Sequence, residues 1–257
     1  MLNENLPVIF FGHGSPMNAI EVNDYTTAWR KIGESLSKPK AVLCISSHWV
    51  TYGLSVTSSD HPRTTHDFLG FPQELFDFEY PAPGSKELAR RIVDVLAPQP
   101  VSLDETWGLD HGCWSVLKWL FPAADVPVVQ LSIDHTLSIE QHFRLGNALR
   151  ALRSEEILIV GSGNIVHNLT MASWDVKQYG WAVAFDERVK NLILAGDYES
   201  IIHYERQGPN AAFAVNSREH FIPLIYVLGA SFPGEKIRFF SEEVMAGSIS
   251  MRGVQIG

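Results

Sequence analysis

Several features that would place this protein outside the cell or in a membrane are missing from its sequence. Only Cys44 and Cys113 occur among 257 residues, so there is no disulfide framework, which fits a reducing compartment. No stretch approaches the roughly 18 consecutive apolar residues of a membrane span. The opening residues, Met1–Asn5, lack the basic and apolar regions of a signal peptide. We therefore expect a cytoplasmic protein without membrane partners.

Positive charge is also scarce, and no cluster of basic residues occurs. The 20 Lys and Arg residues against 29 Asp and Glu residues give a net charge of −9, which argues against binding to a nucleic acid. Hydrophobic residues make up 46% of the chain, enough for a sizeable core. Since there is no repeat, low-complexity tract or linker, we expect residues 1–257 to form a single domain.

Short apolar segments rich in β-branched residues alternate with longer segments of helical periodicity. Strands are expected at 7–11, 41–46, 54–58, 101–104, 126–133, 157–161 and 236–240. Helices are expected at 25–36, 85–96, 113–121, 138–152, 181–195 and 218–228. This alternation predicts an α/β fold, a three-layer α/β/α domain with a largely parallel central sheet covered on both faces. Residues 236–240 and 247–256 are candidates for antiparallel or edge strands.

Ten histidines are unusually many, and several of them follow predicted strands. His13, His48, His135 and His167 each lie a few residues beyond the end of a strand. Because ligands of open α/β sheets bind beyond the carboxyl ends of the strands, histidines at these positions should gather at one edge. His111 lies at a loop-to-helix junction.

These histidines favour an exchangeable metal site. Neutral imidazole is the commonest protein ligand of transition metals, and histidines without cysteine partners are typical of open sites. His220 lies at the start of the helix that contains Pro223 and could join them. No local metal motif such as His-Glu-x-x-His is present.

The other histidines have weaker claims. His66 precedes Asp67, which could simply pair with it, and His135 could be a bystander. Surface positions without a role are expected for His61, His142 and His203. Cys44 and Cys113 are expected to pack in the interior. The aromatic cluster Phe68, Phe71, Phe76, Phe78 and Tyr80 is expected in the core rather than in a pocket wall.

A set of motifs runs in order along the chain. They are Gly12–Asn18, Ser47–Trp49, Thr65–Phe68 with Gly70–Pro72, Tyr80–Gly84, Gly108–Gly112, Val129–Ile133, Gly163–Asn168, His220–Leu224 and Gly247–Met251. In these segments the sequence resembles the DOPA 4,5-dioxygenase branch of class III extradiol ring-cleavage dioxygenases. The resemblance extends nearly end to end, which makes it far more specific than any single motif.

The resemblance implies a metal-dependent enzyme that cleaves a catechol such as DOPA at the 4,5 position and incorporates both atoms of O₂. It implies one divalent metal per chain, bound by His13, His48 and His220, with His167 as a further ligand. Fe²⁺ is the working metal in extradiol chemistry, and Zn²⁺ is also associated with this branch. Many extradiol enzymes have a carboxylate as the third ligand, and Glu219 is the neighbouring alternative to His220.

Catalytic roles follow from the same resemblance. His111 is expected to act as an acid or base or to stabilise oxygen, and His167 is either a ligand or the base. His66 is a candidate for substrate binding. Two other functions stay open: a zinc-dependent hydrolase or amidase that uses the same histidines, and a non-enzymatic binding module on this fold.

Overall fold

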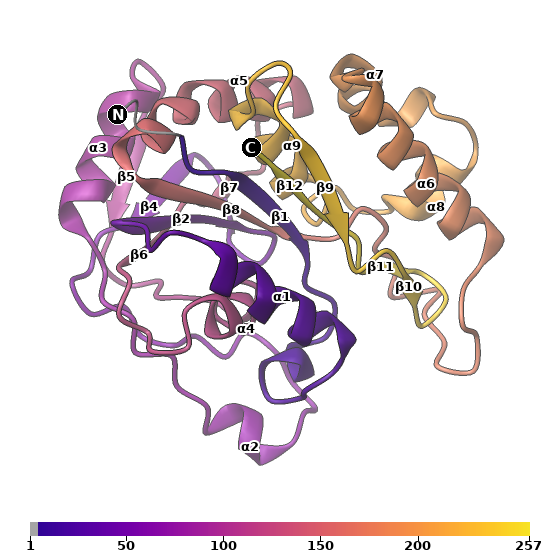
Figure 1. Ribbon diagram of the computed structural model, residues 1–257, viewed down its shortest axis with the longest axis horizontal. Helices are drawn as coiled ribbons and strands as arrows, with labels where there is room; N and C mark the ends of the chain where they lie inside the picture. Colours follow the sequence, from indigo (N-terminus) through magenta and orange to yellow (C-terminus); the bar gives the residue numbers. More distant parts are fainter. Residues whose placement is uncertain (1–4) are drawn as a thin grey trace.

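A six-stranded sheet lies at the centre of the computed structural model, which describes residues 5–257 (Figure 1). The order is β6-β2-β8-β1-β12-β9, with bounds Val128–Gln130, Ala41–Ser46, Ile157–Gly163, Val8–Gly12, Gly253–Ile256 and Ile237–Phe240. The first four of these strands are parallel to one another. β12 is antiparallel to both β1 and β9, as the two C-terminal segments suggested. The largely parallel α/β sheet is confirmed.

Helices cover both faces of this sheet and make the fold three-layered. Along β1, Val8 and Phe10 pack into one core cluster and Ile9 and Phe11 into the other, because successive side chains of a strand point to opposite faces. The first core includes residues of α3 (Lys86–Leu96), α5 (Ile139–Leu149), α6 (Gly180–Ala195) and α9 (Ile222–Ala230). The second includes residues of α1 (Asp24–Ser35) and α4 (His111–Leu120).

Shorter elements complete the chain. The short helices are α2 (Gln73–Phe76), α7 (Tyr198–Ile202) and α8 (Asn210–Ala214), with 3₁₀ turns at Pro16–Ala19, Arg150–Glu155 and Tyr204–Arg206. β10 (Val244–Met245) pairs with β11 (Ile249–Ser250). Within residues 5–257, no helix is both long and apolar enough to cross a bilayer. Residues 1–4, which belong to the segment that lacks signal-peptide features, lie outside the described residues.

Two expectations about the strands are wrong. The segment 126–133 is not one strand. The backbone N–H of Ser132 donates a hydrogen bond to the carbonyl of Ser55, and that of Ile133 to the carbonyl of Trp49, so the backbone changes partners after β6. It continues as β7 (Ile133–Asp134), paired with β3 (Val50–Thr51). The segments 54–58 and 101–104 form β4 (Leu54–Thr57) and β5 (Val101–Asp104), which pair with each other outside the central sheet. β5 is therefore not covered on both faces.

The interior holds one histidine that was expected at the surface. His142 in α5 is fully buried, and its Nδ1 lies 3.0 Å from the hydroxyl of Tyr226 in α9. The expectation of a surface position is wrong because α5 packs closely along α9, and the buried face of α5 includes His142. His61 and His203 are not buried. Cys44 and Cys113 are both buried and free, as expected.

We expect His142 to make the fold less stable in acid. Burial, with help from the charge of Arg218, lowers its pKa from 6.5 to about 4. Below pH 6.5 His142 is therefore protonated in the unfolded chain but stays neutral in the folded chain. The free energy of unfolding falls as the pH drops from 6.5 to 4. One pKa unit corresponds to about 1.4 kcal/mol, so at pH 5 the loss from this residue is roughly 2 kcal/mol.

Urea denaturation at pH 7 and pH 5 checks this expectation. In the His142→Gln variant, the drop in the free energy of unfolding between the two pH values should be smaller than in the wild type. His203→Gln is the matched control, because His203 lies partly exposed at the end of α7, unlike His142, and its replacement should leave the drop unchanged. An unchanged drop in His142→Gln would show that His142 does not carry this pH dependence.

Candidate metal centre

The predicted gathering of histidines at one edge of the sheet takes place for His13, His48 and His167, but not for His135. His13 follows β1 directly, and its N–H donates to the carbonyl of Gly163 at the end of β8 (3.0 Å). Asn164 donates to the carbonyl of His220 (2.8 Å), which draws the segment before α9 against the end of β8. Gly163 permits this approach, because a Cβ there would lie 2.2 Å from the carbonyl oxygen of His220.

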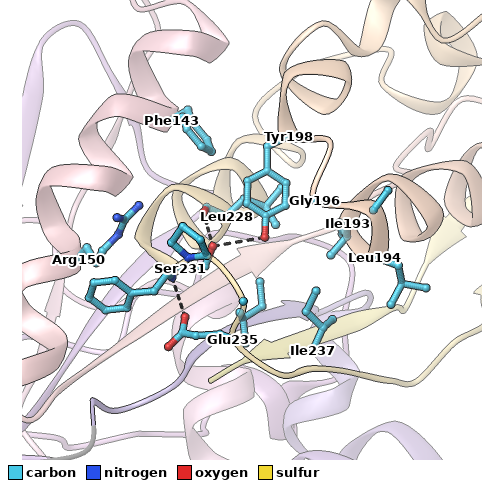
Figure 2. A pocket seen from close by; sticks show the side chains of 15 residues that line it. Phe143, Arg150, Ile193, Leu194, Gly196, Tyr198, Leu228, Ser231, Glu235 and Ile237 are labelled. Atoms are coloured by element: carbon cyan, nitrogen blue, oxygen red, sulfur yellow. Dashed lines mark hydrogen bonds between the residues drawn. The ribbon is translucent and has the colours of Figure 1, made fainter.

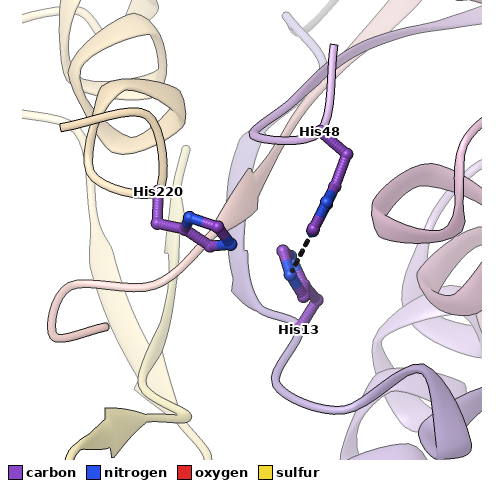
Figure 3. Close-up of side chains that lie close together, drawn as sticks. All are labelled: His13, His48 and His220. Atoms are coloured by element: carbon purple, nitrogen blue, oxygen red, sulfur yellow. Dashed lines mark hydrogen bonds between the residues drawn. The ribbon is translucent and has the colours of Figure 1, made fainter. Parts of the chain in front are cut away.

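Three imidazoles converge at this edge, as Figure 3 shows. Nε2 of His13 and Nε2 of His48 are 3.1 Å apart. A ring nitrogen of His220 joins them, so that all three candidate ligand atoms lie within 4.8 Å of one another. His13 and His220 are buried and His48 is half-buried. The three side chains come from segments 35 or more residues apart in the chain.

The hydrogen bonds behind these rings fix which nitrogen carries the proton. The hydroxyl of Ser162 donates its single proton to the carbonyl of Gly112 (2.5 Å), so it must accept the Nδ1–H of His13 (2.9 Å). Nδ1 of His48 faces a carboxylate oxygen of Asp67 at 3.3 Å. In His13 Nε2 is therefore left with a lone pair, and the nearby carboxylate of Asp67 favours the same tautomer in His48.

His220 is oriented in the same way by its neighbour. Its Nδ1 lies 3.3 Å from Oε1 of Glu219, and Glu219 also accepts a hydrogen bond from Ser217 (2.5 Å). Glu219 belongs to no group of close candidate ligands among the described residues, whereas His220 does. Despite burial, hydrogen bonds from His220 and Ser217 lower the pKa of Glu219 to about 2, so Glu219 is an anion that accepts a hydrogen bond from His220.

This donor set fits a divalent metal ion. Burial, reinforced by the neighbouring imidazoles, lowers the pKa of His13 and of His48 well below 6.5, and burial also lowers that of His220. All three rings are therefore neutral, and their lone pairs would repel one another without a cation between them. Neutral imidazole nitrogens backed by a hydroxyl or a carboxylate are typical metal ligands.

Asp67 links this trio to His111. One carboxylate oxygen accepts from Nδ1 of His111 (2.9 Å), and the other accepts from its backbone N–H (2.9 Å) at the start of α4. Burial alone would raise the pKa of Asp67, but the ring and backbone hydrogen bonds of His111 lower it. Asp67, His48 and His111 also form a second group of close candidate ligands. In this second group, the Nδ1 atoms of His48 and His111 already face the carboxylate of Asp67 and are not free to bind an ion. We therefore favour the first group as the metal site.

A buried polar network holds α4 in place beneath His111. The carboxylate of Asp110 caps the helix by accepting from the N–H of Cys113 (3.1 Å). It also accepts from Ser46 at the end of β2 (2.6 Å) and from Gln130 at the end of β6 (2.7 Å). α4 begins at His111 rather than at residue 113 because of this cap. The position of His111 is therefore fixed by two strands of the central sheet.

His167 lies beside the three converging rings but not among them. Its ring stacks on that of His220, with centroids 3.5 Å apart and planes 6° apart. Burial and the nearby His220 lower its pKa to about 3. In the part of the chain that the structure describes, His167 is in no group of close candidate ligands. It lines the same cavity and can face a bound molecule there.

The histidines open into a cavity of about 290 Å³. Five of them line it, together with Asp67, and its remaining wall is mostly apolar. The lining residues are His13, Gly14, Ser15, Pro16, His48, Asp67, Phe68, Phe71, His111, His167, Leu169, Trp174, His220, Met245 and Ile249. Phe68 and Phe71 are thus wall residues, contrary to the expectation that they lie in the core. Leu169 and Trp174 were not identified from the sequence, since a loop residue carries no periodic signal.

The structure does not bring His66 into this cavity. Its Nε2 donates to the carbonyl of Phe78 (2.9 Å), and its ring packs against Phe68 and Trp114. His66 therefore lies one layer behind the wall, in contact with Phe68. His135 is exposed near Tyr52 and lies apart from the site.

A larger cavity of about 490 Å³ lies elsewhere, beside the C-terminal ends of α5, α6 and α9 (Figure 2). None of the clustered histidines lines it. Its carboxylate already has partners within the protein: Glu235 pairs with Arg153 at 2.5 Å and accepts a hydrogen bond from the N–H of Phe232 (2.7 Å). This cavity shows none of the converging free donors of the histidine site.

Comparisons with known proteins identify the family of this chain. Residues 9–250 match the family model of the catalytic LigB subunit of aromatic ring-opening dioxygenase. The chain is 48% identical, over 100% of its length and 97% of the relative, to a protein of Escherichia coli (strain K12) named 4,5-DOPA dioxygenase extradiol. A protein of Beta vulgaris with the same name is 40% identical over 96% of this chain and 95% of its own.

A solved structure has the same fold. The crystal structure of an uncharacterized protein from Escherichia coli K12 superposes with a TM-score of 0.86 and 42% identity, covering 98% of this chain and 100% of the other. The chain belongs to the LigB family of aromatic ring-opening dioxygenases. It is a metal-dependent extradiol ring-cleavage dioxygenase of class III, and the resemblance to the DOPA 4,5-dioxygenase type is confirmed.

Proposed function

We propose that this enzyme cleaves a catechol such as DOPA at the 4,5 position and incorporates both atoms of O₂ into the product. The observation that carries the proposal is the convergence of three neutral imidazole nitrogens beside His111 in a largely apolar cavity. The relatives named for DOPA cleavage support this class of substrate. Family membership favours this reaction over the zinc hydrolase and the binding module.

One divalent metal ion per chain is proposed to be bound by His13, His48 and His220. We propose Fe²⁺ for the active enzyme, because Zn²⁺ is redox-silent. When bound, Fe²⁺ would supply a site that orients the diol and O₂ and relays electron density between them. Ser162, Asp67 and Glu219 hold the three rings with their Nε2 atoms free, so the chain is preorganised for this ion.

His111 is proposed as the acid–base residue. Its Nδ1–H is held by Asp67, which leaves Nε2 as the nitrogen that accepts a proton from the catechol hydroxyl and returns it to the product. Asp67 fixes the tautomer and offsets the charge when His111 is protonated. This is a positioning role, because Asp67 acts through His111 and His48.

His167 is proposed as a base that contacts the substrate rather than as a tight ligand. Its stacking on His220 keeps it next to the site, and its neutral ring can accept a hydrogen bond from a substrate hydroxyl. For His66 we propose an indirect contribution to substrate binding, through Phe68. The single domain over residues 1–257 and the cytoplasmic location stay predictions.

Isotope labelling tests the proposed reaction. The Fe²⁺-loaded enzyme, supplied with catechols and ¹⁸O₂, should consume one O₂ per ring, and both labelled atoms should be found in a ring-opened semialdehyde cleaved beside the diol. The Zn²⁺-loaded enzyme should consume no oxygen. Hydrolysis of amides or esters by the Zn²⁺ form, without oxygen uptake by the Fe²⁺ form, would establish the hydrolase instead.

Asp67→Asn should impair turnover more than metal binding. The carboxylate of Asp67 faces the ring of His48 and accepts hydrogen bonds from the ring and the backbone N–H of His111, whereas an amide has only one oxygen to accept them. We therefore expect kcat to fall about 10–100-fold. Metal content, measured by elemental analysis, should stay near one per chain. Asp104→Asn is the control, since Asp104 also accepts several hydrogen bonds but lies at the end of β5 and does not line the cavity. Equal kcat values in the two variants would contradict the positioning role.

A further inference from the structure

Arg150 is a cation without a carboxylate partner at the edge of the larger cavity (Figure 2). In the part of the chain that the structure describes, it takes part in no ion pair, whereas the neighbouring Arg153 pairs with Glu235. Nη2 of Arg150 donates to the carbonyl of Gly229 (2.8 Å) and to the side chain of Asn147, but its buried Nε has no hydrogen-bond partner among the described residues. Burial and the charge of Arg153 lower the pKa of Arg150. A bound anion would offset both costs.

The other charged side chain of this cavity does not cancel the charge of Arg150. Glu235 is the single carboxylate among the described lining residues, and its two oxygens accept from two nitrogens of Arg153, at 2.8 and 2.5 Å. One oxygen also accepts from the N–H of Phe232 (2.7 Å). The pair of Glu235 and Arg153 is therefore neutral, and the cavity keeps the positive charge of Arg150.

The rest of the wall is largely apolar and suits a hydrocarbon chain. Leu228 and Ile237 line it, and Leu194 is 55% exposed although it belongs to the cavity wall. The hydroxyl of Tyr198 reaches Ser231 only at 3.4 Å, a weak hydrogen bond that a ligand can replace. A volume of about 490 Å³, an apolar wall and a few placed polar groups are typical of small-molecule sites.

This cavity is separate from the one that the histidines line. No residue lines both cavities. α9 begins two residues after His220, which lines the histidine cavity, and Leu228 near the other end of α9 lines the larger one. The two cavities therefore lie at opposite ends of this helix, and a ligand in the larger one leaves the proposed metal ligands untouched.

We propose that the larger cavity is a second binding site, for a medium-chain fatty acid or another carboxylate with an aliphatic chain, and that Arg150 binds the carboxylate. A hydrogen bond between a guanidinium and a carboxylate is charge-assisted and stronger than one between neutral groups. The aliphatic chain lies against Leu194, Leu228 and Ile237. This site goes beyond the proposed ring cleavage and does not depend on it.

A matched pair of ligands tests the site. Octanoate and octanamide have the same chain, but only octanoate carries a charge. In isothermal titration calorimetry of the metal-loaded enzyme, under nitrogen and with catechol at saturation, one octanoate should bind per chain. Its affinity should be about tenfold or more higher than that of octanamide, because only the carboxylate pairs with Arg150. Absence of octanoate binding, equal affinities of the two ligands, or displacement of catechol by octanoate would each overturn the proposal.

Variants of the cavity complete the test. Arg150→Gln should remove the preference for octanoate over octanamide, whereas Arg144→Gln should keep it, because Arg144 pairs with Glu140 at the surface of α5 (2.5 Å). Leu194→Glu adds a negative charge to the wall and should lower the affinity for octanoate about tenfold or more. Leu103→Glu is its control, because Leu103 is 51% exposed and does not line the cavity. Wild-type affinity for octanoate in Leu194→Glu would overturn the proposal even if Arg150→Gln folds poorly.

Discussion

His13→Ala and His48→Ala should each abolish metal binding at stoichiometric Fe²⁺ and reduce ring cleavage to the background rate. Loss of an outer-shell partner costs about 10–100-fold in metal affinity or activity, and loss of a ligand should cost more. The two Nε2 atoms are 3.1 Å apart, so each residue supplies a nitrogen at the point where the rings converge. Elemental analysis of the purified variants, together with oxygen uptake, measures both effects.

The controls for these variants are histidines away from the site. His203→Ala and His61→Ala should retain one metal per chain and wild-type turnover, because neither residue lines the cavity. Full metal content in both His13→Ala and His48→Ala would show that the ion binds elsewhere, for example at the second group formed by His48, Asp67 and His111. His220→Ala separates the two groups, since His220 belongs only to the first.

His111→Ala should keep the metal and lose most of the turnover. Removal of a general acid–base residue typically costs ~10²–10⁴-fold, and the three proposed ligands stay in place without His111. The measurement is kcat with metal content determined on the same sample. Added imidazole, which can occupy the space left by the side chain, should restore part of the rate in His111→Ala but not in His13→Ala.

The same substitution distinguishes proton transfer from a purely structural role. The backbone N–H at residue 111 still donates to Asp67 after replacement, and Asp110 still caps α4, so the fold around the site is retained. A His111→Ala enzyme that turns over at the wild-type rate would remove His111 from the mechanism. Likewise, if the His167→Ala enzyme turns over at the wild-type rate, His167 is not the base.

Much of the fold follows from local patterns that the sequence displays. The apolar β-branched segments 41–46 and 157–161 form neighbouring parallel strands. They could be predicted because strands buried on both faces are continuously apolar in sequence. The end of the segment 126–133 did not follow this pattern. Its apolar residues continue, but the backbone changes partners at Ser132, and only contacts with Ser55 and Trp49 reveal that change.

The gathering of the site histidines was also predictable, since it depends on topology alone. His13, His48 and His167 follow strands whose carboxyl ends share one edge of a parallel sheet. His220 required the resemblance to the family, because a histidine at a helix start has no such rule. The roles of Asp67 and Ser162 were missed: neither residue is close in sequence to the imidazole of His48 or His13 that it orients.

The sequence by itself determined the α/β class, the family and the edge of the sheet where the metal site lies, because strand periodicity and motif order are properties of the chain. Only the tertiary structure decided which ring nitrogens face one another, that His167 stacks on His220, and that His142 is buried. Each of these depends on how segments far apart in sequence pack and on the hydrogen bonds that packing leaves available. The orientation of a side chain is a property of its neighbours in space, and the sequence does not list those neighbours.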